Sequence, residues 1–392
     1  MSAPQSILLL NYEFPPLGGG AANATLFIAR SLASLGHRPV VVTSGLQDEQ
    51  SCRIESGVIV HRLRTGRASP DRSTMGDMGR YLLAAGRQAP RIAREEKCHA
   101  AIAFFSIPSG AVARWLNARL RLPYIVSLRG SDVPGHDISL NRMHALTRPL
   151  RRSVLANAVA IVANSAGLAA TARMADPFPV RVVSNGVDGS LFRPPLESER
   201  NSPEHRFRLL FVGRVHREKN LGVVLHQIAA LPAMVRAAIE LQVAGDGAQR
   251  PELETLAASL GLTPQIQWLG WQKKSALPEL YQRADALVNP SLYEGMPNVV
   301  LEAMASGLPV VASDVPGNRS VVSPGTTGVL FPLASPGELG VALTRLVTDR
   351  AWGRMLGRAG RECTENEFSW RNTAQSYLEL LGSGQATSPF HE

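Results

Sequence analysis

The residue types best suited to chemistry lie in one stretch of the second half of the chain. Glu294 and Glu302 are eight positions apart, and Gly295 and Pro297 between them permit a tight loop followed by the first turn of a helix. Glu302 interrupts an otherwise apolar helical segment, so a solvated helix face explains it poorly. Carboxylates accept hydrogen bonds and free backbone N–H groups donate them, as sugar hydroxyls require. The stretch therefore predicts a site that binds hydroxyl groups through hydrogen bonds.

A second loop, at the end of an expected strand, carries positive charge. Gly213 lets the chain turn sharply, and Arg214 and Lys219 follow on the same loop. Arginine with its planar fork and lysine as a point charge can together neutralise a diphosphate. A basic loop at a strand end is often only solvated, so this motif is weak by itself.

A third motif near the start of the chain is rich in glycine. Gly18, Gly19 and Gly20 stand between an apolar strand and a helix, where the backbone can approach a ligand and the helix N-terminus offers N–H groups to an anion. A dinucleotide fingerprint needs glycine where Asn23 stands, and no acidic residue closes the second strand. These departures argue against NAD binding. A tight strand-to-helix turn with no ligand is the alternative.

Strand and helix patterns alternate in both halves, and 392 residues exceed one comfortable core. We expect two doubly wound parallel α/β domains that bind ligands at the carboxyl ends of their strands. The expected domains are residues 1–187 and 208–368, with a linker at 188–207 and a last helix at 369–385. The expected strands are Ile7–Leu10, Val40–Thr43, Val58–His61, Ala100–Phe104, Tyr124–Ser127, Val159–Ala163, Arg181–Val183, Arg208–Val212, Ile239–Val243, Ile266–Leu269, Ala286–Asn289, Pro309–Ala312 and Gly328–Phe331. The expected helices include Ala22–Leu35, Arg80–Glu96, Asn141–Leu155, Leu221–Leu231, Pro251–Leu260 and Val299–Ser306.

Composition narrows the class of protein. The net charge is +9, and residues 1–200 carry +10 while the remainder carries −1. This charge fits an anionic substrate, an anionic membrane or nucleic acid as a partner, and it also fits a bias of the genome towards arginine. Nucleic acid is disfavoured, because aromatic residues are few (6%) and the sequence contains no nucleic-acid-binding motif. Three scattered cysteines indicate neither disulfides nor zinc. With only a short apolar run at the N-terminus and no long apolar window, we expect a cytoplasmic protein.

Together the motifs resemble family 4 of the retaining glycosyltransferases, which have the GT-B fold. The resemblance covers nearly the whole chain, and the paired glutamates are its most specific part. It implies two facing Rossmann-like domains, an N-terminal acceptor-binding one and a C-terminal one for a nucleotide sugar, with a C-terminal helix that crosses back to the first. The matching motifs are Pro15 to Gly20, Ser184 to Asp188, Phe192 to Pro194, Gly213 to Lys219, Ala244 to Gly247 and Glu294 to Pro309.

The resemblance also implies roles for individual residues. Arg214 and Lys219 would bind the donor diphosphate and stabilise it as the leaving group. Glu294 would contact the transferred sugar, and Glu302 would hold the ribose hydroxyls. The remaining donor-side residues would be backbone-rich loops around sugar and phosphate: Gly18, Gly19, Gly20, Gly213, Gly295, Met296, Pro297, Asn298 and Val299, with Ile266 to Gly270 at the edge of the base.

One position departs from the family pattern. Many members have His-Gly-x-Asp after the fifth strand, and this chain has Arg129-Gly130-Ser131-Asp132. Arginine cannot be a neutral acceptor or a proton carrier, so Arg129 is expected to pair with a phosphate or an acidic sugar on the acceptor or sugar side. Asp132 is retained.

The expected activity is transfer of a hexose, with retention, from a UDP- or GDP-linked sugar to a glycan or lipid-linked acceptor of cell-surface polysaccharide or glycolipid. No Asp-x-Asp is present, and the basic pair leads us to expect no metal or cofactor. The alternatives are a GT-B epimerase and a non-catalytic nucleotide-binding protein. Arginines alternate with leucines over Asn141–Leu155, which predicts peripheral docking on an anionic membrane, with a merely solvated helix as the alternative.

Overall fold

The computed structural model describes residues 4–70, 73–135, 140–195 and 206–386. The chain divides into two compact units, Met1–Asn185 together with Trp370–Glu392, and Gly186–Ser369. Of the expected linker at 188–207, residues 196–205 lie outside the described residues, and residues 188–195 belong to the second unit.

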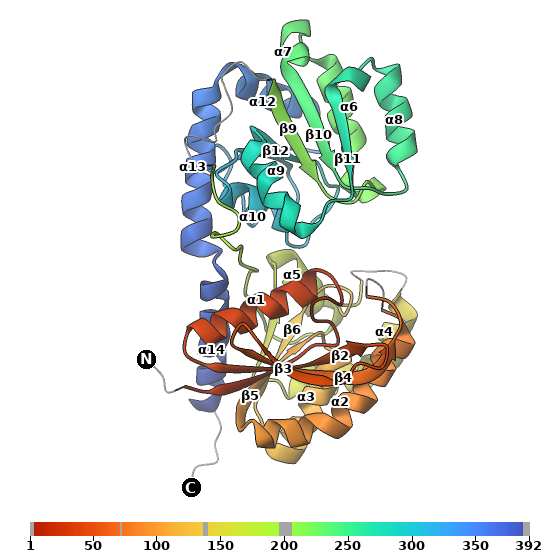
Figure 1. Cartoon of the computed structure of the whole chain (residues 1–392), viewed down its shortest axis with the longest axis vertical. Helices are drawn as coiled ribbons and strands as arrows, with labels where there is room; N and C mark the ends of the chain where they lie inside the picture. Colours follow the sequence, from red (N-terminus) through yellow and green to blue (C-terminus); the bar gives the residue numbers. More distant parts are fainter. Residues whose placement is uncertain (1–3, 71–72, 136–139, 196–205, 387–392) are drawn as a thin grey trace. The chain divides into compact units, whose positions relative to one another are not determined.

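The first unit contains an eight-stranded sheet with the order β3-β4-β2-β1-β5-β6-β7-β8 (Figure 1). All pairings are parallel except the pairing of β3 with β4. All seven expected strands are present, and the apolar runs of all but the edge strand β8 are nearly completely buried, as strands covered by helices on both faces must be. The strands are β1 (Ser6–Leu10), β2 (Arg38–Leu46), β3 (Ser51–Glu55), β4 (Val58–Arg67), β5 (Cys98–Phe104), β6 (Tyr124–Leu128), β7 (Ala160–Ala163) and β8 (Val180–Val182).

Among its described residues, this unit has six α-helices. The helix α2 begins five residues before its expected start, because Thr74 and Asp77 form a capping box: Asp77 N donates to Thr74 Oγ1 (3.2 Å) and Thr74 N donates to Asp77 Oδ2 (2.8 Å). The helices are α1 (Gly20–Ser34), α2 (Met75–Glu95), α3 (Ser109–Leu120), α4 (Asn141–Ala156), α5 (Ala166–Ala175) and α14 (Trp370–Ala386).

The last helix, α14, comes from the far end of the chain and packs against α1 (Figure 1). The ring of Trp370 stacks on Phe27 at 5.2 Å between centroids and 11° between planes. The Tyr377 hydroxyl lies 2.6 Å from Ser127 Oγ at the end of β6. The first unit is therefore completed by residues far from it in sequence.

The second unit contains a six-stranded parallel sheet with the order β11-β10-β9-β12-β13-β14. All six expected strands are present. Leu209 and Phe211 pack into one core and Leu210 into another, because alternate residues of a strand face opposite sides of the sheet. The strands are β9 (Phe207–Val212), β10 (Ile239–Ala244), β11 (Ile266–Gly270), β12 (Ala286–Asn289), β13 (Val310–Ser313) and β14 (Val329–Phe331). The helices are α6 (Leu221–Ala230), α7 (Ala233–Ala238), α8 (Arg250–Ser259), α9 (Leu277–Arg283), α10 (Asn298–Ala305), α11 (Pro316–Arg319), α12 (Gly337–Thr348) and α13 (Arg350–Glu367), with single turns at Arg217–Lys219, Thr263–Gln265 and Lys274–Ala276.

Each sheet has one point where the chain switches the direction in which it adds strands. This point lies between β1 and β5 in the first unit and between β9 and β12 in the second. Loops that leave two such strands diverge and open a crevice at their carboxyl ends, where ligands bind in open α/β sheets. The predicted site residues follow β1, β6, β9 and β12.

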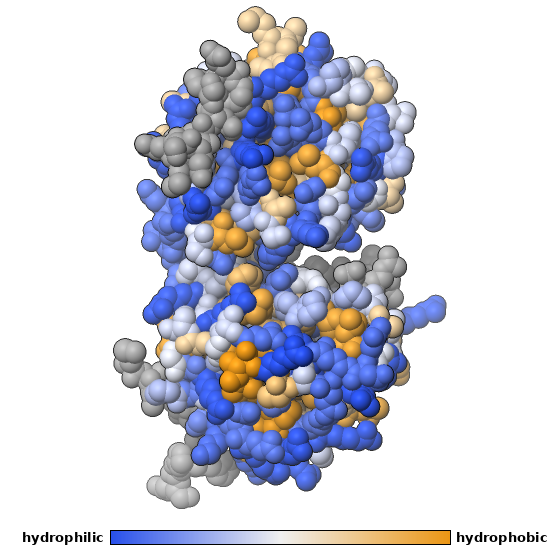
Figure 2. Space-filling view, in the orientation of Figure 1, coloured by the Kyte–Doolittle hydropathy of each residue, from blue (hydrophilic) through white to orange (hydrophobic). Residues whose placement is uncertain are grey.

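On the face that Figure 2 shows, hydrophilic residues predominate in both units, with apolar side chains in small groups between them. Among the described helices, none is both long enough and apolar enough to cross a membrane.

Candidate functional site

The loops after β9 and β12 are held together at the switch point of the second unit. Leu292 N donates to Glu218 O (2.9 Å), and Asn220 Nδ2 donates to Pro290 O (3.3 Å). Lys219 Nζ lies 2.5 Å from Glu294 Oε1. Two of the residues that the sequence singled out, 75 positions apart, are therefore in direct contact.

The Lys219–Glu294 pair is largely shielded from water. Its side chains are 21% and 10% exposed, so the attraction between the charges is screened less than in a surface ion pair. The Oγ of Ser291 lies 2.7 Å from the same carboxylate oxygen. An ammonium group has three donors, and Glu294 accepts one of them. Lys219 keeps two N–H groups with which it can bind a further anion.

Glu294 is connected through Ser291 to a network of buried polar side chains. Ser291 Oγ lies 2.8 Å from Asn289 Oδ1, and Asn289 Nδ2 donates to Asn318 Oδ1 (3.1 Å). Asn318 Nδ2 in turn donates to Ser313 O (2.9 Å). All four side chains are at most 3% exposed. The network joins the ends of β12 and β13 and fixes the loop that carries Glu294.

Glycine is required where other segments approach this site. A Cβ on Gly317 would lie 2.3 Å from the carbonyl oxygen of Glu294, so any larger residue would displace the catalytic candidate. A Cβ on Gly245 would lie 1.8 Å from the carbonyl oxygen of Gly213, where the loops after β9 and β10 cross. The sequence pattern did not indicate these close contacts, although Gly245 is part of the Ala244 to Gly247 motif.

Arg214 is the most exposed of the charged residues in the predicted set. Its side chain is 73% exposed, and its Nη2 lies 3.3 Å from Glu218 Oε1 in an i,i+4 ion pair. Exposed pairs of this kind contribute little to stability, about 0.5 kcal/mol. The guanidinium can therefore leave Glu218 for a more strongly charged ligand.

Glu302 lies within α10 and is only 9% exposed, as its apolar neighbours in the sequence indicated. Its Oε2 accepts a hydrogen bond from the Tyr281 hydroxyl at 3.0 Å. Burial raises the pKa of Glu302 to about 7, although Lys274 and Tyr281 oppose the shift. The helix starts at Asn298, immediately after Pro297, and a Cβ on Gly295 would meet nothing within 4 Å. The turn between the two glutamates therefore has open space beside it.

The glycine-rich loop of the first unit is fastened by a buried carboxylate that the sequence analysis missed. Gly18 N donates to Pro70 O (2.9 Å), and Gly19 N donates to Glu13, which pairs at 3.6 Å with the fully buried Arg67. Burial raises the pKa of Glu13, and Arg67 and Gly19 oppose this. Two amides of the loop are thus already used. A Cβ at Gly19 or Gly20 would meet nothing within 4 Å, so the outer side of the loop is open.

Asp132 and Arg129 occupy fixed positions in the first unit. Asp132 is 6% exposed, and its carboxylate accepts backbone hydrogen bonds from Ser106 (2.7 Å), Arg129 (2.9 Å) and Gly130 (3.2 Å). It therefore ties the loops after β5 and β6 together.

The guanidinium of Arg129 is positioned by residues that no motif indicated. Its Nη1 donates to Asn185 Oδ1 (2.8 Å), its Nη2 donates to Tyr377 OH (3.3 Å), and its Cζ lies 4.8 Å from the centre of the Phe104 ring. Tyr377 lies on α14, so the returning helix helps to orient the residue that departs from the family pattern.

Three of the cavities that the described residues form each lie within one unit. A cavity of about 210 Å³ opens at the switch point of the first unit, between α2 and α4, and apolar side chains dominate its lining. Its lining residues include Tyr12, Met75, Met78, Leu82, Phe105, Ile107, Ser131, Asp132 and Met143. It lies next to the retained Asp132.

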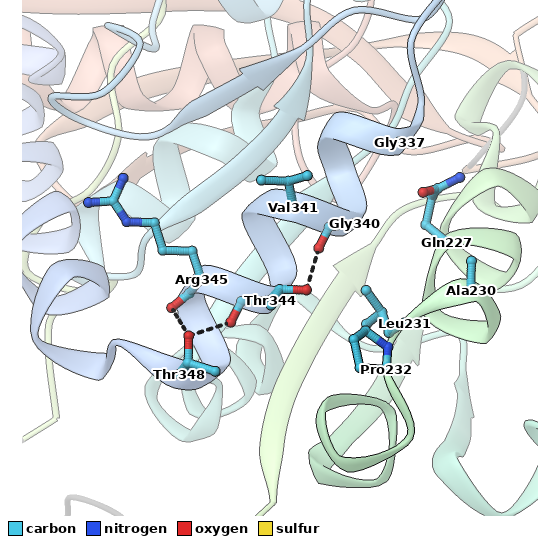
Figure 3. Close-up of a pocket in the computed structure, with 10 residues that line it drawn as sticks. All are labelled: Gln227, Ala230, Leu231, Pro232, Gly337, Gly340, Val341, Thr344, Arg345 and Thr348. Atoms are coloured by element: carbon cyan, nitrogen blue, oxygen red, sulfur yellow. Dashed lines mark hydrogen bonds between the residues drawn. The ribbon is translucent and has the colours of Figure 1, made fainter.

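The other two cavities lie away from the predicted residues. One of about 550 Å³ lies along α13 at the start of β9. The other, of about 500 Å³, lies between α6 and α12 (Figure 3). There the threonine hydroxyls are bonded to carbonyls of their own helix, and Arg345 points away from Leu231 and Pro232 and lies 3.9 Å from the Trp352 ring centre. Neither cavity brings together groups suited to catalysis.

Within the part of the chain that the structure describes, no group of three or more His, Cys, Asp or Glu side chains is arranged to hold a metal ion.

Comparisons with known proteins agree with this geometry. The model of the family "Glycosyl transferase 4-like domain" matches residues 19–186, and that of "Glycosyl transferases group 1" matches residues 192–363. The two matches are adjacent and together span most of the chain. The chain therefore contains two successive glycosyltransferase domains, one matched by each model, and it has the GT-B fold.

Individual relatives are moderately similar. D-inositol 3-phosphate glycosyltransferase of Salinispora arenicola is 36% identical over 257 residues, which cover 59% of this chain and 56% of the relative. The chain thus spans little more than half the length of this relative and of its counterpart in Salinispora tropica. Sucrose-phosphate synthase of Thermosynechococcus elongatus shares the fold, with a TM-score of 0.77 and 24% identity over 98% of this chain and 100% of that one. HepE of Anabaena, solved in complex with UDP and glucose, also shares the fold. Its TM-score is 0.71 and its sequence identity is 19%, over 97% of this chain and 100% of HepE.

Proposed function

We propose that this protein transfers a hexose from a nucleoside diphosphate sugar to a glycan or lipid-linked acceptor, with retention at the anomeric carbon. The observation that carries the proposal is the contact of Lys219 with Glu294 at the switch point of the second unit, one short turn before the buried Glu302. A cation and a carboxylate there suit a diphosphate and the sugar attached to it. Glu302 suits the ribose, because a buried carboxylate accepts hydrogen bonds from hydroxyl groups.

The costly step is departure of the nucleoside diphosphate from an oxocarbenium-like carbon. In the proposed mechanism Lys219, through its two remaining N–H groups, and Arg214 stabilise the charge that develops on the leaving oxygen. Glu294 positions the transferred sugar, and the Gly295 to Val299 loop surrounds sugar and phosphate. The acceptor hydroxyl attacks from the side of the leaving group and gives its proton to the departing phosphate oxygen. Two protein cations supply the neutralisation, so we propose that the reaction requires no metal.

The first unit is proposed to bind the acceptor. Its cavity at the switch point is lined mainly by apolar side chains, which suits the apolar part of a lipid-linked acceptor. Arg129, held in place by Asn185 and Tyr377, is proposed to bind a phosphate or an acidic sugar. Asp132 acts indirectly, through the two loops that it joins.

Nucleotide binding is expected to be visible as thermal stabilisation. At a concentration near 100 times its Kd, the correct donor should add about 2.7 kcal/mol to the free energy of unfolding and raise Tm by several degrees. UDP-, GDP- and TDP-sugars are compared by differential scanning fluorimetry; HepE, a neighbour in fold, makes UDP the first choice. If none of the nucleotides raises Tm, the proposal is wrong.

Product analysis separates the proposal from its alternatives. With donor and a lipid or glycan acceptor fraction, we expect a glycosylated acceptor and free nucleoside diphosphate. An epimerase would give an isomerised nucleotide sugar in the absence of acceptor. A non-catalytic protein would bind nucleotide and release no product.

Peripheral membrane docking through α4 is a further part of the proposal. On this helix Leu146 is 83% exposed and Leu150 is 43% exposed, and Arg142, Arg148 and Arg152 are exposed around them. Arginines near an anionic surface contribute about 1 kcal/mol each, and the leucines can enter the interface between them.

Vesicle flotation tests this docking. The protein should float with vesicles that contain anionic lipid and remain behind with neutral ones. Changing the three arginines of α4 to glutamine should weaken binding on the order of 100-fold. Arg354→Gln with Arg358→Gln, which removes exposed charges from α13 in the other unit, should leave flotation unchanged. Equal flotation on neutral vesicles would rule the docking out.

A further inference from the structure

The carboxylate of Glu302 has a partner that no motif indicated. Tyr281 on α9 is 0% exposed, and its hydroxyl is 3.0 Å from Glu302 Oε2, with the carbonyl oxygen of Val299 farther away at 3.4 Å. Burial and the nearby Glu302 carboxylate hold the pKa of Tyr281 well above its usual value. The tyrosine therefore keeps its proton and remains a hydrogen-bond donor.

The position of the Tyr281 ring is fixed by its surroundings. Phe192 meets it edge to face, with 5.6 Å between ring centres and 80° between planes. Arg361 Nη1 donates to the carbonyl of Phe192 (2.9 Å) and to that of Ala305 at the end of α10 (2.6 Å). One guanidinium thus joins the segment that fixes the tyrosine to the helix that carries the glutamate. This explains Phe192 in the Phe192 to Pro194 motif, which the proposed catalytic roles leave without a purpose.

We infer that Tyr281 is the positioning residue of Glu302: its hydroxyl holds Oε2 and directs Oε1 to the ribose hydroxyls of the donor. The inference rests on the proposed function. It assigns to Tyr281 no contact with the substrate, so its effect must pass through the carboxylate.

Ionisation of Glu302 makes this role measurable. A ribose hydroxyl donates its hydrogen bond to the carboxylate form, so nucleotide binding requires Glu302 to lose its proton. With a pKa of about 7 in the free protein, nucleotide affinity should rise with pH and level off above that value. The ionisable groups on the packed elements are Tyr281 on α9, Lys274 on the turn after β11, and Arg361 and Cys363 on α13. Arg361 is engaged with carbonyls, and burial raises the pKa of Cys363, so it stays neutral at neutral pH.

The test is Tyr281→Phe, which removes one hydroxyl and leaves the ring packed against Phe192. The dissociation constant of UDP, or of whichever nucleotide the wild type binds, is measured by calorimetry from about pH 5 to about pH 9. Loss of a donor to the carboxylate should move the midpoint of the pH profile upwards by about one unit, which weakens binding about fivefold at neutral pH and about tenfold at lower pH. At high pH, where Glu302 is ionised in both proteins, the difference in affinity should shrink to the part caused by the lost orientation of the carboxylate.

Two further variants complete the test. Tyr124→Phe removes a buried hydroxyl that donates to Val154 O (2.6 Å) in the first unit, and it should leave the midpoint unchanged. In a Glu302→Gln background, Tyr281→Phe should have little further effect on affinity, because its only route of action is gone. If Tyr281→Phe weakens binding equally at every pH, or adds its full effect to Glu302→Gln, the inference is wrong. If the wild type binds no nucleotide, the proposed function itself has failed.

Discussion

Lys219→Ala is expected to lower turnover on the order of 10²–10³-fold, the scale of losing one preorganised charge stabiliser. The ammonium group lies at the switch point, is 21% exposed and retains donors beyond the one that Glu294 accepts. The side chain is proposed to act on charge that develops during the reaction, so kcat should fall more than KM rises. Arg214→Ala is expected to lower turnover by a factor in the same range, because the weak ion pair with Glu218 leaves the Arg214 guanidinium available to the diphosphate.

Arg217→Ala is the matched control for this prediction. Arg217 lies on the same single turn as Lys219, its side chain is exposed, and it carries the same charge. Turnover by this variant should stay within about twofold of the wild type, as for most surface changes. Steady-state transfer rates decide between the outcomes. A near-normal rate for Lys219→Ala would remove the basis of the proposed mechanism.

Glu302→Gln is expected to change stability and donor binding in opposite directions. Folding raises the pKa of this carboxyl from 4.5 to about 7. Below about pH 4 both states are protonated and the substitution should be neutral. As pH rises from 4.5 through about 7 the unfolded state ionises first, and the folded protein loses up to about 3 kcal/mol of stability. Glutamine cannot ionise, so the variant should be more stable than the wild type at pH 8 by a similar amount.

The same substitution should weaken nucleotide binding by about 10- to 100-fold, since a hydrogen bond to a charged acceptor contributes about 1.5–3 kcal/mol. Chemical denaturation at about pH 5 and pH 8 measures the stability, and calorimetry measures the affinity. Glu279→Gln on α9, where the glutamate is exposed and paired with Arg283, should change neither quantity appreciably. A stability difference that is the same at both pH values would contradict the assigned ionisation of Glu302.

The sequence predicted the sheets well because their apolar runs are covered on both faces, and such runs leave little choice of structure. It missed β3, whose residues Ser51–Glu55 are mostly exposed and contain no apolar run. It placed the start of α2 too late because the Thr74 capping box was not recognised. The errors lie where short polar contacts, and not burial, set the boundary.

Contact between Lys219 and Glu294 could be anticipated, since each follows a strand and neighbouring strands end at one edge of the sheet. The partners of the site could not. Tyr281 is part of an ordinary amphipathic helix, and nothing in its neighbours indicates that its hydroxyl reaches Glu302. Asp132 was expected on the acceptor or sugar side, but the sequence did not indicate that three backbone N–H groups donate to its carboxylate. Side-chain networks of this kind depend on distances between elements, which spacing in the sequence does not contain.

The return of α14 to the first unit affects the order in which the chain can fold during synthesis. Residues 1–185 leave the ribosome long before Trp370 and Tyr377, which pack on Phe27 and Ser127. The N-terminal unit must therefore wait, with part of its apolar surface uncovered, while the whole intervening unit is translated. The unit whose strands are synthesised first is therefore the last to complete its folding.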